Sequence, residues 1–203
     1  MKLAKLLESV SSLDKKIIVT APHAMIQIHE EHEKNTHPFD FRAKEAAEAL
    51  AAVLKKDFHV DLFLSEVPRS IIDLNRVPAR PYKWRQDILD KINQYTDAGN
   101  QVILFDVHSF GNKDRDAWID NALVLLDGES DVDNLFAEIK EIKGNIKRIE
   151  IKERDDIVQT AKKAGATALL LEFNEDTEIL SRDELLAICD KAAQFAKELD
   201  NDD

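Results

Sequence analysis

The sequence predicts an α/β protein with three layers, α/β/α, around a central, mostly parallel mixed sheet of the phosphorylase/hydrolase-like kind. Apolar runs of strand length alternate with segments of helical periodicity along the 203 residues, which is the pattern of helices covering both faces of a parallel sheet. One apolar run leads straight into polar residues and a glycine, in the segment QVILFDVHSFG at 101–111. Residues 15–23, KKIIVTAPH, repeat this design. Such strands deliver polar side chains to one edge of a sheet, where ligands bind in open α/β folds.

In the first half of the chain, short apolar runs predict strands and apolar residues at helical spacing predict helices. The spacing of Trp84, Ile88, Ile92 and Tyr95, for example, is that of one helix face. The predicted elements are a short amphipathic helix at 2–10, a strand at 17–20, a long loop at 24–39, a helix at 40–56, a strand at 61–67, a proline-punctuated loop at 68–81, a helix from 84 to about 99 and a strand at 102–105.

In the second half of the chain, two local sequence patterns indicate a particular structure. Residues 146–151 alternate apolar and charged side chains, as a half-exposed strand does, and Ser181 and Glu184 have the spacing of a capping box at a helix start. The predicted elements are a polar loop at 112–120, a strand at 122–126, a helix at 132–142, a strand at 146–151, a helix at 155–164, a strand at 168–173 and a helix at 181–199. The sequence shows no internal repeat or linker, so residues 1–203 are predicted to form a single domain.

The composition narrows the function classes. The formal net charge of -12 argues against a nucleic-acid partner and against an anionic membrane surface. The single Cys189 cannot form an internal disulfide, and its helical spacing with Leu185 favours a packed thiol over a nucleophile. The first sixteen residues are too polar for a signal peptide, and no run reaches membrane-spanning length. We expect a cytoplasmic protein, with no prediction of its oligomeric state.

His23 and His108 are the first candidate site residues. Each follows an apolar strand, and if the two strands are parallel neighbours, both imidazoles reach the same sheet edge. Two converging histidines indicate a metal site, and Asp106 is placed to orient His108 as a second-shell carboxylate. The alternative is that each histidine is a strand-end residue making one ordinary hydrogen bond.

A three-ligand zinc site with an open position for water needs one more ligand. Asp40 is the preferred choice, because a carboxylate at a helix start is well placed to face a cation at a strand end. Other candidates in the same His- and Glu-rich segment are His29, His32, Glu31 and Glu33, and the alternative is a solvated charged loop that supplies no ligand.

A glutamate and a group of arginines complete the candidate site. Glu172 interrupts the apolar run at 168–173, which indicates either a general base or a residue just past the buried part of the strand. Arg69, Arg76 and Arg80 lie in one loop of an acidic protein, which indicates a bound carboxylate, although a surface turn with solvated arginines fits the composition too.

Four segments carry a family resemblance: TAPHA at 20–24, PRSIIDLNR at 68–76, LFDVHSF at 104–110 and LLLEFNE at 169–175. In this order they resemble the N-formylglutamate amidohydrolase-like family and, more distantly, the zinc carboxypeptidases and aspartoacylases. The resemblance implies an α/β/α fold with one catalytic zinc. It would make His23 and His108 zinc ligands and Glu172 the base that activates the attacking water. The substrate-binding residues would be Asn75, Arg76, Arg80 and Ser109, with Arg69 polarising the scissile carbonyl.

The resulting prediction is a zinc-dependent hydrolase that cleaves the amide bond of a small N-acyl acidic amino acid, N-formyl included, or a similar carboxylate. A carboxypeptidase-like metallopeptidase is one alternative. The other is a non-catalytic relative that binds an anion or a protein partner. Ile26 favours this last alternative, because the carboxypeptidase-like pattern has a glutamate ligand three residues after its first histidine.

Overall fold

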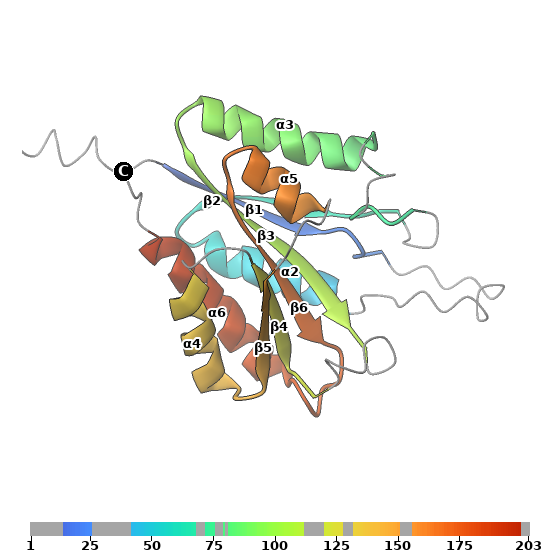
Figure 1. The fold of residues 1–203 in the computed structure, drawn as a ribbon, viewed down its shortest axis with the longest axis vertical. Helices are drawn as coiled ribbons and strands as arrows, with labels where there is room; N and C mark the ends of the chain where they lie inside the picture. The colour runs from blue at the N-terminus through green and yellow to red at the C-terminus, as the bar shows by residue number, and fades with distance from the viewer. Residues whose placement is uncertain are drawn as a thin grey trace, which may run out of the picture.

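The structure is a computed structural model, and it describes residues 14–25, 42–67, 72–75, 79, 81–111, 120–127, 132–150 and 156–199. The described residues form six strands and five helices, which alternate along the chain for most of its length (Figure 1). In order they are β1 (Lys15–Ala21), α2 (Ala43–Leu54), β2 (His59–Leu64), α3 (Lys83–Asp97), β3 (Gln101–Phe110), β4 (Leu123–Asp127), α4 (Asp133–Ile142), β5 (Ile146–Glu150), α5 (Ile157–Lys163), β6 (Thr167–Asn174) and α6 (Arg182–Glu198).

The strands form one mixed sheet in the order β2-β1-β3-β6-β4-β5. Strands β2, β1, β3 and β6 are parallel to one another, and β5 is parallel to β4. The β4 strand runs antiparallel to β6, so the sheet changes direction once. The central strand β3 is buried over its whole length after Gln101. Its position explains why its sequence is a near-continuous apolar run, since a parallel strand covered on both faces has no solvent side.

Helices cover both faces of the sheet, and the side chains of each strand alternate between them. On β3, Ile103 and Phe105 pack in the core cluster beneath α2, α4 and α6. Val102 and Leu104 pack on the other face, beneath α3 and α5. Figure 1 shows these two helical layers on opposite sides of the sheet. The predicted three-layer α/β/α class with a mostly parallel mixed sheet is therefore confirmed.

Local signals in the sequence set the helix ends. The predicted capping box of α6 is present, because the Ser181 hydroxyl accepts from the Glu184 backbone N–H while the Glu184 carboxylate accepts from the Ser181 N–H. A hydrogen bond from Lys143, together with these contacts, lowers the pKa of Glu184 to about 2. Gly99 follows α3 with a φ of 78°, a left-handed conformation that glycine adopts without strain. Cys189 is buried in the core as predicted, and burial raises the pKa of its thiol to about 12.

Element boundaries differ from the predictions by a few residues. The strand predicted at 61–67 spans His59–Leu64 instead, because Ser65 and Val67 form a local turn in which the Ser65 hydroxyl binds the Val67 backbone. The helix predicted at 2–10 lies outside the described residues, and so does most of the loop predicted at 24–39. Among the helices that the structure describes, none combines the length and the hydrophobicity needed to cross a membrane.

Candidate active site

The structure brings His23 and His108 together at the carboxyl ends of the central strands. His23 lies in the turn after β1, and His108 lies near the end of β3, which pairs in parallel with β1. The two rings meet edge to face, with centroids 4.9 Å apart and an interplanar angle of 74°. Both side chains are buried, at 3% and 4% exposure. The strand order thus produces the convergence that the sequence predicted.

A carboxylate holds one nitrogen of each imidazole. The Nε2 atom of His23 lies 2.9 Å from Asp73 Oδ1, and the Nε2 atom of His108 lies 3.0 Å from Asp106 Oδ2. A carboxylate only accepts, so each Nε2 carries the hydrogen of that bond. Asp106 is itself fixed, because its Oδ1 accepts from the Thr20 hydroxyl on β1 at 2.7 Å. Paired carboxylates of this kind fix the tautomer and orientation of histidines that bind metals.

Asn75 connects the two histidine–carboxylate pairs. Its backbone N–H donates to Asp73 Oδ1 at 3.0 Å, which closes a turn in the 72–75 segment. Its side-chain oxygen accepts from the backbone N–H of Ile157, the first residue of α5, at 3.1 Å. That bond fixes the amide orientation and leaves the Asn75 Nδ2 atom 3.2 Å from Nε2 of His108. Asn75 therefore ties the loop, the α5 N-terminus and His108 into one network.

The competition at His108 Nε2 has a chemical consequence. The ring nitrogen faces the acceptor Asp106 and the amide donor of Asn75, and one hydrogen position cannot satisfy both. With the hydrogen of Nε2 donated to Asp106, the Asn75 amide lies beside this nitrogen at 3.2 Å without a lone pair to donate to. Asp106 therefore holds the ring by a hydrogen bond, and Asn75 limits its position by contact.

Glu172 lies beside His108 on the adjacent strand. The two residues are register partners in the parallel β3–β6 pair, and such partners point to the same face. That face carries Leu104 and Leu170, so Glu172 and His108 both project on the side covered by α3 and α5. Glu172 is 5% exposed, and its antiparallel partner on β4 is the apolar Val124. A carboxylate in this position can exchange a proton with a water molecule held at the His108 edge.

Ser109 lies on the opposite side of the sheet from His108, because successive residues of a strand alternate in direction. Its register partner Phe173 packs in the core beneath α2 and α6. The Ser109 hydroxyl donates to Glu175 at 2.8 Å and accepts from the backbone N–H of Arg42 at 3.1 Å, at the start of α2. Ser109 thus contacts the start of α2 on the other face of the sheet, and its role in substrate binding stays a prediction.

The remaining predicted residues lie outside the described part of the chain. These are the preferred third ligand Asp40, its alternatives His29, His32, Glu31 and Glu33, and the arginines Arg69, Arg76 and Arg80. Their roles stay predictions.

The chemistry of the described donors suits zinc, which favours imidazole nitrogen and carboxylate oxygen. Two buried imidazoles, each with a carboxylate on its other side, and a third carboxylate at Glu172 lie at one sheet edge. Within the described residues, however, no group of three His, Cys, Asp or Glu side chains is arranged to hold a metal ion. The donor types therefore fit, and the identity of a third ligand stays a prediction.

No protein-family model matches the sequence, and neither does any curated protein sequence. The fold, however, resembles solved structures. The gene product Atu2144 from Agrobacterium tumefaciens aligns with a TM-score of 0.60 and 18% identity, over 89% of this chain and 88% of that one. The catalytic domain of CwlV, an N-acetylmuramoyl-L-alanine amidase from Bacillus (Paenibacillus) polymyxa var. colistinus, aligns with a TM-score of 0.50 and 12% identity, over 91% and 97% of the two chains. At these identities the likeness shows a shared fold.

The predicted membership of the N-formylglutamate amidohydrolase-like family is wrong. No family model matches, and the named enzyme among these structural neighbours is an N-acetylmuramoyl-L-alanine amidase. The four segments that carried the resemblance are short, and three of them, 20–24, 104–110 and 169–175, lie in or beside neighbouring strands of the sheet. Histidine, aspartate and asparagine at such positions meet the needs of a sheet-edge site in general, so they do not identify one family.

Two residues of the network were not assigned a site role from the sequence. Asp73 was noted only as part of the DLNR segment, yet it holds His23. Thr20 was assigned to a strand, yet it fixes Asp106. Asp73 carried a readable signal, because an aspartate in a loop often accepts from the backbone N–H two residues on, in an Asx turn. The Thr20–Asp106 contact depends on the pairing register of β1 and β3, which the sequence does not reveal.

Proposed function

We propose that the protein is a metal-dependent amide hydrolase with its active site at the His23–His108 edge. The observation that supports this proposal is the pairing of two buried imidazoles, each held by a carboxylate, with Glu172 in register beside His108. This combination provides two metal ligands and a proton acceptor on a fold shared with an amidase. Zinc, when bound, would act as a Lewis acid toward the amide carbonyl and lower the pKa of water.

Each of the described residues would have a separate role in the proposed hydrolysis. Asp73 and Asp106 orient the rings of His23 and His108 and raise their basicity as ligands. Glu172 takes the proton of the attacking water and returns it to the leaving amine, a shuttle worth about 10²- to 10⁴-fold in rate. Asn75 holds His108 and the α5 N-terminus at a fixed separation.

The proposed substrate is a small N-acyl amino acid with a free carboxylate. The bond named for the CwlV amidase joins a muramoyl acyl group to the nitrogen of L-alanine, which is also an N-acyl amino acid linkage. Carboxylate recognition rests on the predicted roles of Arg69, Arg76 and Arg80. Acidic N-acyl amino acids are the preferred class, because a second carboxylate would use more than one arginine of this loop.

Metal content and activity test the proposal together. We would supply zinc to the folded protein, remove the excess and measure bound metal by elemental analysis in the wild type, His23→Ala and His108→Ala. His59→Ala is the matched control, because His59 is 57% exposed on β2 and contacts Asp61 rather than the network. Stoichiometric zinc in the wild type and the control, with loss in both other variants, is expected. Hydrolysis would be followed on N-acetyl amino acids and on a muramoyl-L-alanine peptide.

A non-catalytic, anion-binding protein is the second candidate, and one observation favours it. The Nε2 atoms of both histidines already have protein partners, as they would in a purely structural network. Absence of bound zinc in the wild type, with no hydrolysis of either substrate type, would overturn the hydrolase proposal in favour of this candidate. Release of free C-terminal amino acids from unblocked peptides, with N-acyl amino acids untouched, would instead indicate a carboxypeptidase-like enzyme.

A further inference from the structure

The α5 helix is short and depends on its neighbours for its position. It has seven residues, whereas isolated helices shorter than about 12 residues are marginal in water. Its apolar side chains Ile157, Val158 and Ala161 are buried in the core on this face of the sheet. Apolar burial keeps the helix on the sheet, but it has no preferred direction, so it does not fix how the helix is shifted or rotated there. The polar contacts of α5 therefore set its position.

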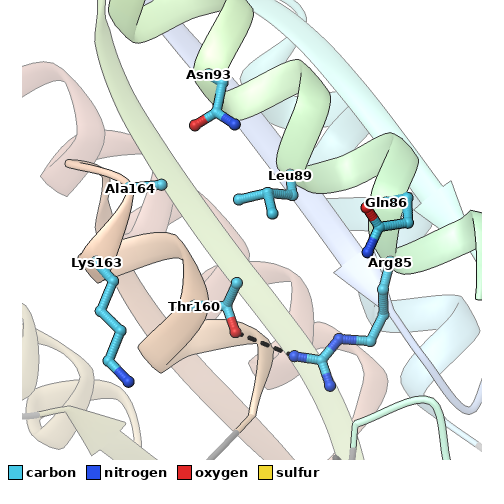
Figure 2. A pocket seen from close by; sticks show the side chains of 7 residues that line it. All are labelled: Arg85, Gln86, Leu89, Asn93, Thr160, Lys163 and Ala164. Carbon is cyan, nitrogen blue, oxygen red and sulfur yellow. Dashed lines mark hydrogen bonds between the residues drawn. The ribbon is translucent and has the colours of Figure 1, made fainter. Parts of the chain in front are cut away.

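One of these polar contacts joins α5 to α3. Figure 2 shows the Arg85 guanidinium reaching from α3 to the Thr160 hydroxyl, with Nη2 3.0 Å from Oγ1. Thr160 donates its own hydroxyl hydrogen to the Asp156 carbonyl at 2.9 Å, so its oxygen accepts from Arg85. Arg85 is 5% exposed, and a hydrogen bond from a charged donor is stronger than one between neutral groups. The Arg85–Thr160 bond therefore holds the first turn of α5 against α3.

Another polar contact joins the same turn of α5 to the candidate active site. The backbone N–H of Ile157 has no acceptor within its own helix, as at any helix start, and it donates to the Asn75 side-chain oxygen at 3.1 Å. Asn75 is 6% exposed, and its amide nitrogen lies 3.2 Å from Nε2 of His108. A displacement of this turn would therefore move the Asn75 amide and remove the contact that limits the position of the His108 ring.

We propose that Thr160 is a positioning residue of the candidate active site, acting on the His108 ring through α5 and Asn75. This inference rests on the proposed function, because it assigns Thr160 a part in holding a metal ligand. The Thr160 hydroxyl itself bonds to Arg85 and Asp156, outside the histidine–carboxylate pairs. Its loss should weaken zinc binding by about threefold to tenfold, less than the 10- to 100-fold typical of a residue that contacts a ligand directly.

Two variants of Thr160 and one control isolate the hydroxyl. Thr160→Val removes the hydroxyl and keeps the branched shape, whereas Thr160→Ser keeps the hydroxyl. Thr160 is the side of the bond to change, because Arg85 also interacts with other groups. Thr96→Val on α3 is the matched control. The Thr96 hydroxyl is likewise half-buried and bonds to the carbonyl four residues earlier, at 3.1 Å, but both of its acceptors, Ile92 and Asn93, lie in its own helix.

NMR of the imidazole nitrogens and of the hydrogen on Nε2 reports on the His108 ring directly. It would be recorded on the full chain before zinc is added. We expect Thr160→Val to shift these signals and to speed the exchange of that hydrogen with water, because the ring is less restricted. Thr160→Ser and Thr96→Val should give the wild-type signals. Zinc affinity, measured by competition with a chromogenic chelator, should fall in Thr160→Val and stay at the wild-type value in the other two variants.

A double variant tests the route through Asn75. In an Asn75→Ala background the amide that contacts His108 is absent, so Thr160→Val should add less than about a twofold change in zinc affinity. The same loss in both backgrounds would show that Thr160 affects the site by another route, and it would overturn the proposal.

Two further results would overturn it. Wild-type His108 signals in Thr160→Val would show that the hydroxyl does not position the ring. Equal changes in Thr160→Val and Thr96→Val would show that loss of any threonine hydroxyl from this helical layer disturbs the ring. Failure of the hydrolase proposal is distinguishable from both, because it would appear as a wild type that neither binds zinc nor hydrolyses amides, while the NMR comparison on the metal-free chain would still decide the role of Thr160.

Discussion

Two polar regions in the described part of the chain differ in how their side chains are held. One is the His23–His108 edge, and the other is the pocket between α3 and α5, which Arg85, Leu89, Asn93 and Thr160 line. At the edge, His23 and His108 are buried and each has a carboxylate partner within 3.0 Å. In the pocket, Arg85 is fixed by Thr160, whereas Lys163 is exposed on a helix end. A buried network fixes positions, as reacting groups require, whereas an exposed side chain such as that of Lys163 keeps its rotamer freedom.

One helix connects these two regions. The first residue of α5, Ile157, donates its backbone N–H to Asn75 in the edge network, and Thr160 contacts Arg85 in the pocket one turn further along. Asp156 caps the same helix by accepting from the Gln159 N–H. The short α5 therefore belongs to both regions. Substitutions that change one region and leave the other unchanged would show how far the two regions are independent.

The largest expected effect is that of Glu172→Gln on turnover. Glutamine keeps the shape of the side chain but cannot take a proton, so kcat should fall by about 10²- to 10⁴-fold with bound zinc retained. Glu175→Gln is the control, because Glu175 lies three residues later and contacts Ser109 on the other face of the sheet. Steady-state kinetics and elemental analysis on both variants provide the measurement. Equal losses of turnover in the two variants would remove Glu172 from its proposed role.

Asp106→Asn should act on the metal through His108. An asparagine can still pair with the ring, but it lacks the negative charge that raises the basicity of the imidazole. We expect zinc affinity to fall by about 10- to 100-fold, as measured by competition with a chromogenic chelator. An unchanged zinc affinity would show that Asp106 does not orient a ligand.

The fold and the residues at the strand ends could be predicted because both depend on short-range patterns. An apolar run followed by D-x-H places His108 at a strand end whatever the rest of the chain does. The same pattern, read with period two, places Ser109 on the opposite face of the sheet from His108.

Contacts that depend on register and on helix placement could not be predicted. Thr20 meets Asp106 only because β1 and β3 pair at that level, and a shift of one residue would turn Thr20 to the other face. Arg85 faces Thr160 because α3 and α5 lie on the same face of the sheet, although the two residues are 75 positions apart in the chain. The sequence of α3 alone is that of an ordinary amphipathic helix.

A pair of identical substitutions compares the two regions in stability. Thr20→Val removes a hydroxyl that donates to a fully buried carboxylate, and it should lower the free energy of unfolding by about 1–3 kcal/mol. Thr160→Val removes a half-buried hydroxyl in an open pocket, where water can replace it, and should cost less than about 1 kcal/mol. Urea unfolding of both variants provides the comparison. A larger loss for Thr160→Val would contradict the distinction between a buried network and an open pocket.

The smallest expected effect concerns α6, which lies on the face of the sheet away from the α3/α5 pocket. The lowered pKa of Glu184, about 2 against an ordinary 4.5, means that the folded protein favours the charged carboxylate. Its contribution to stability is present in full above about pH 4.5 and is lost as the pH falls through about 2. Glu184→Gln should therefore lower the free energy of unfolding by about 1 kcal/mol at neutral pH, and the difference from wild type should shrink over this acid range.

Glu138→Gln is the reference for that measurement, because Glu138 makes only a surface ion pair, 3.4 Å long, with Lys191. Urea unfolding at a series of pH values should give a pH-dependent difference for Glu184→Gln and a small, nearly constant one for Glu138→Gln. Zinc content should be the same in both variants and the wild type. A change in zinc content would show that the helical layer containing α6 is coupled through the sheet to the His23–His108 edge.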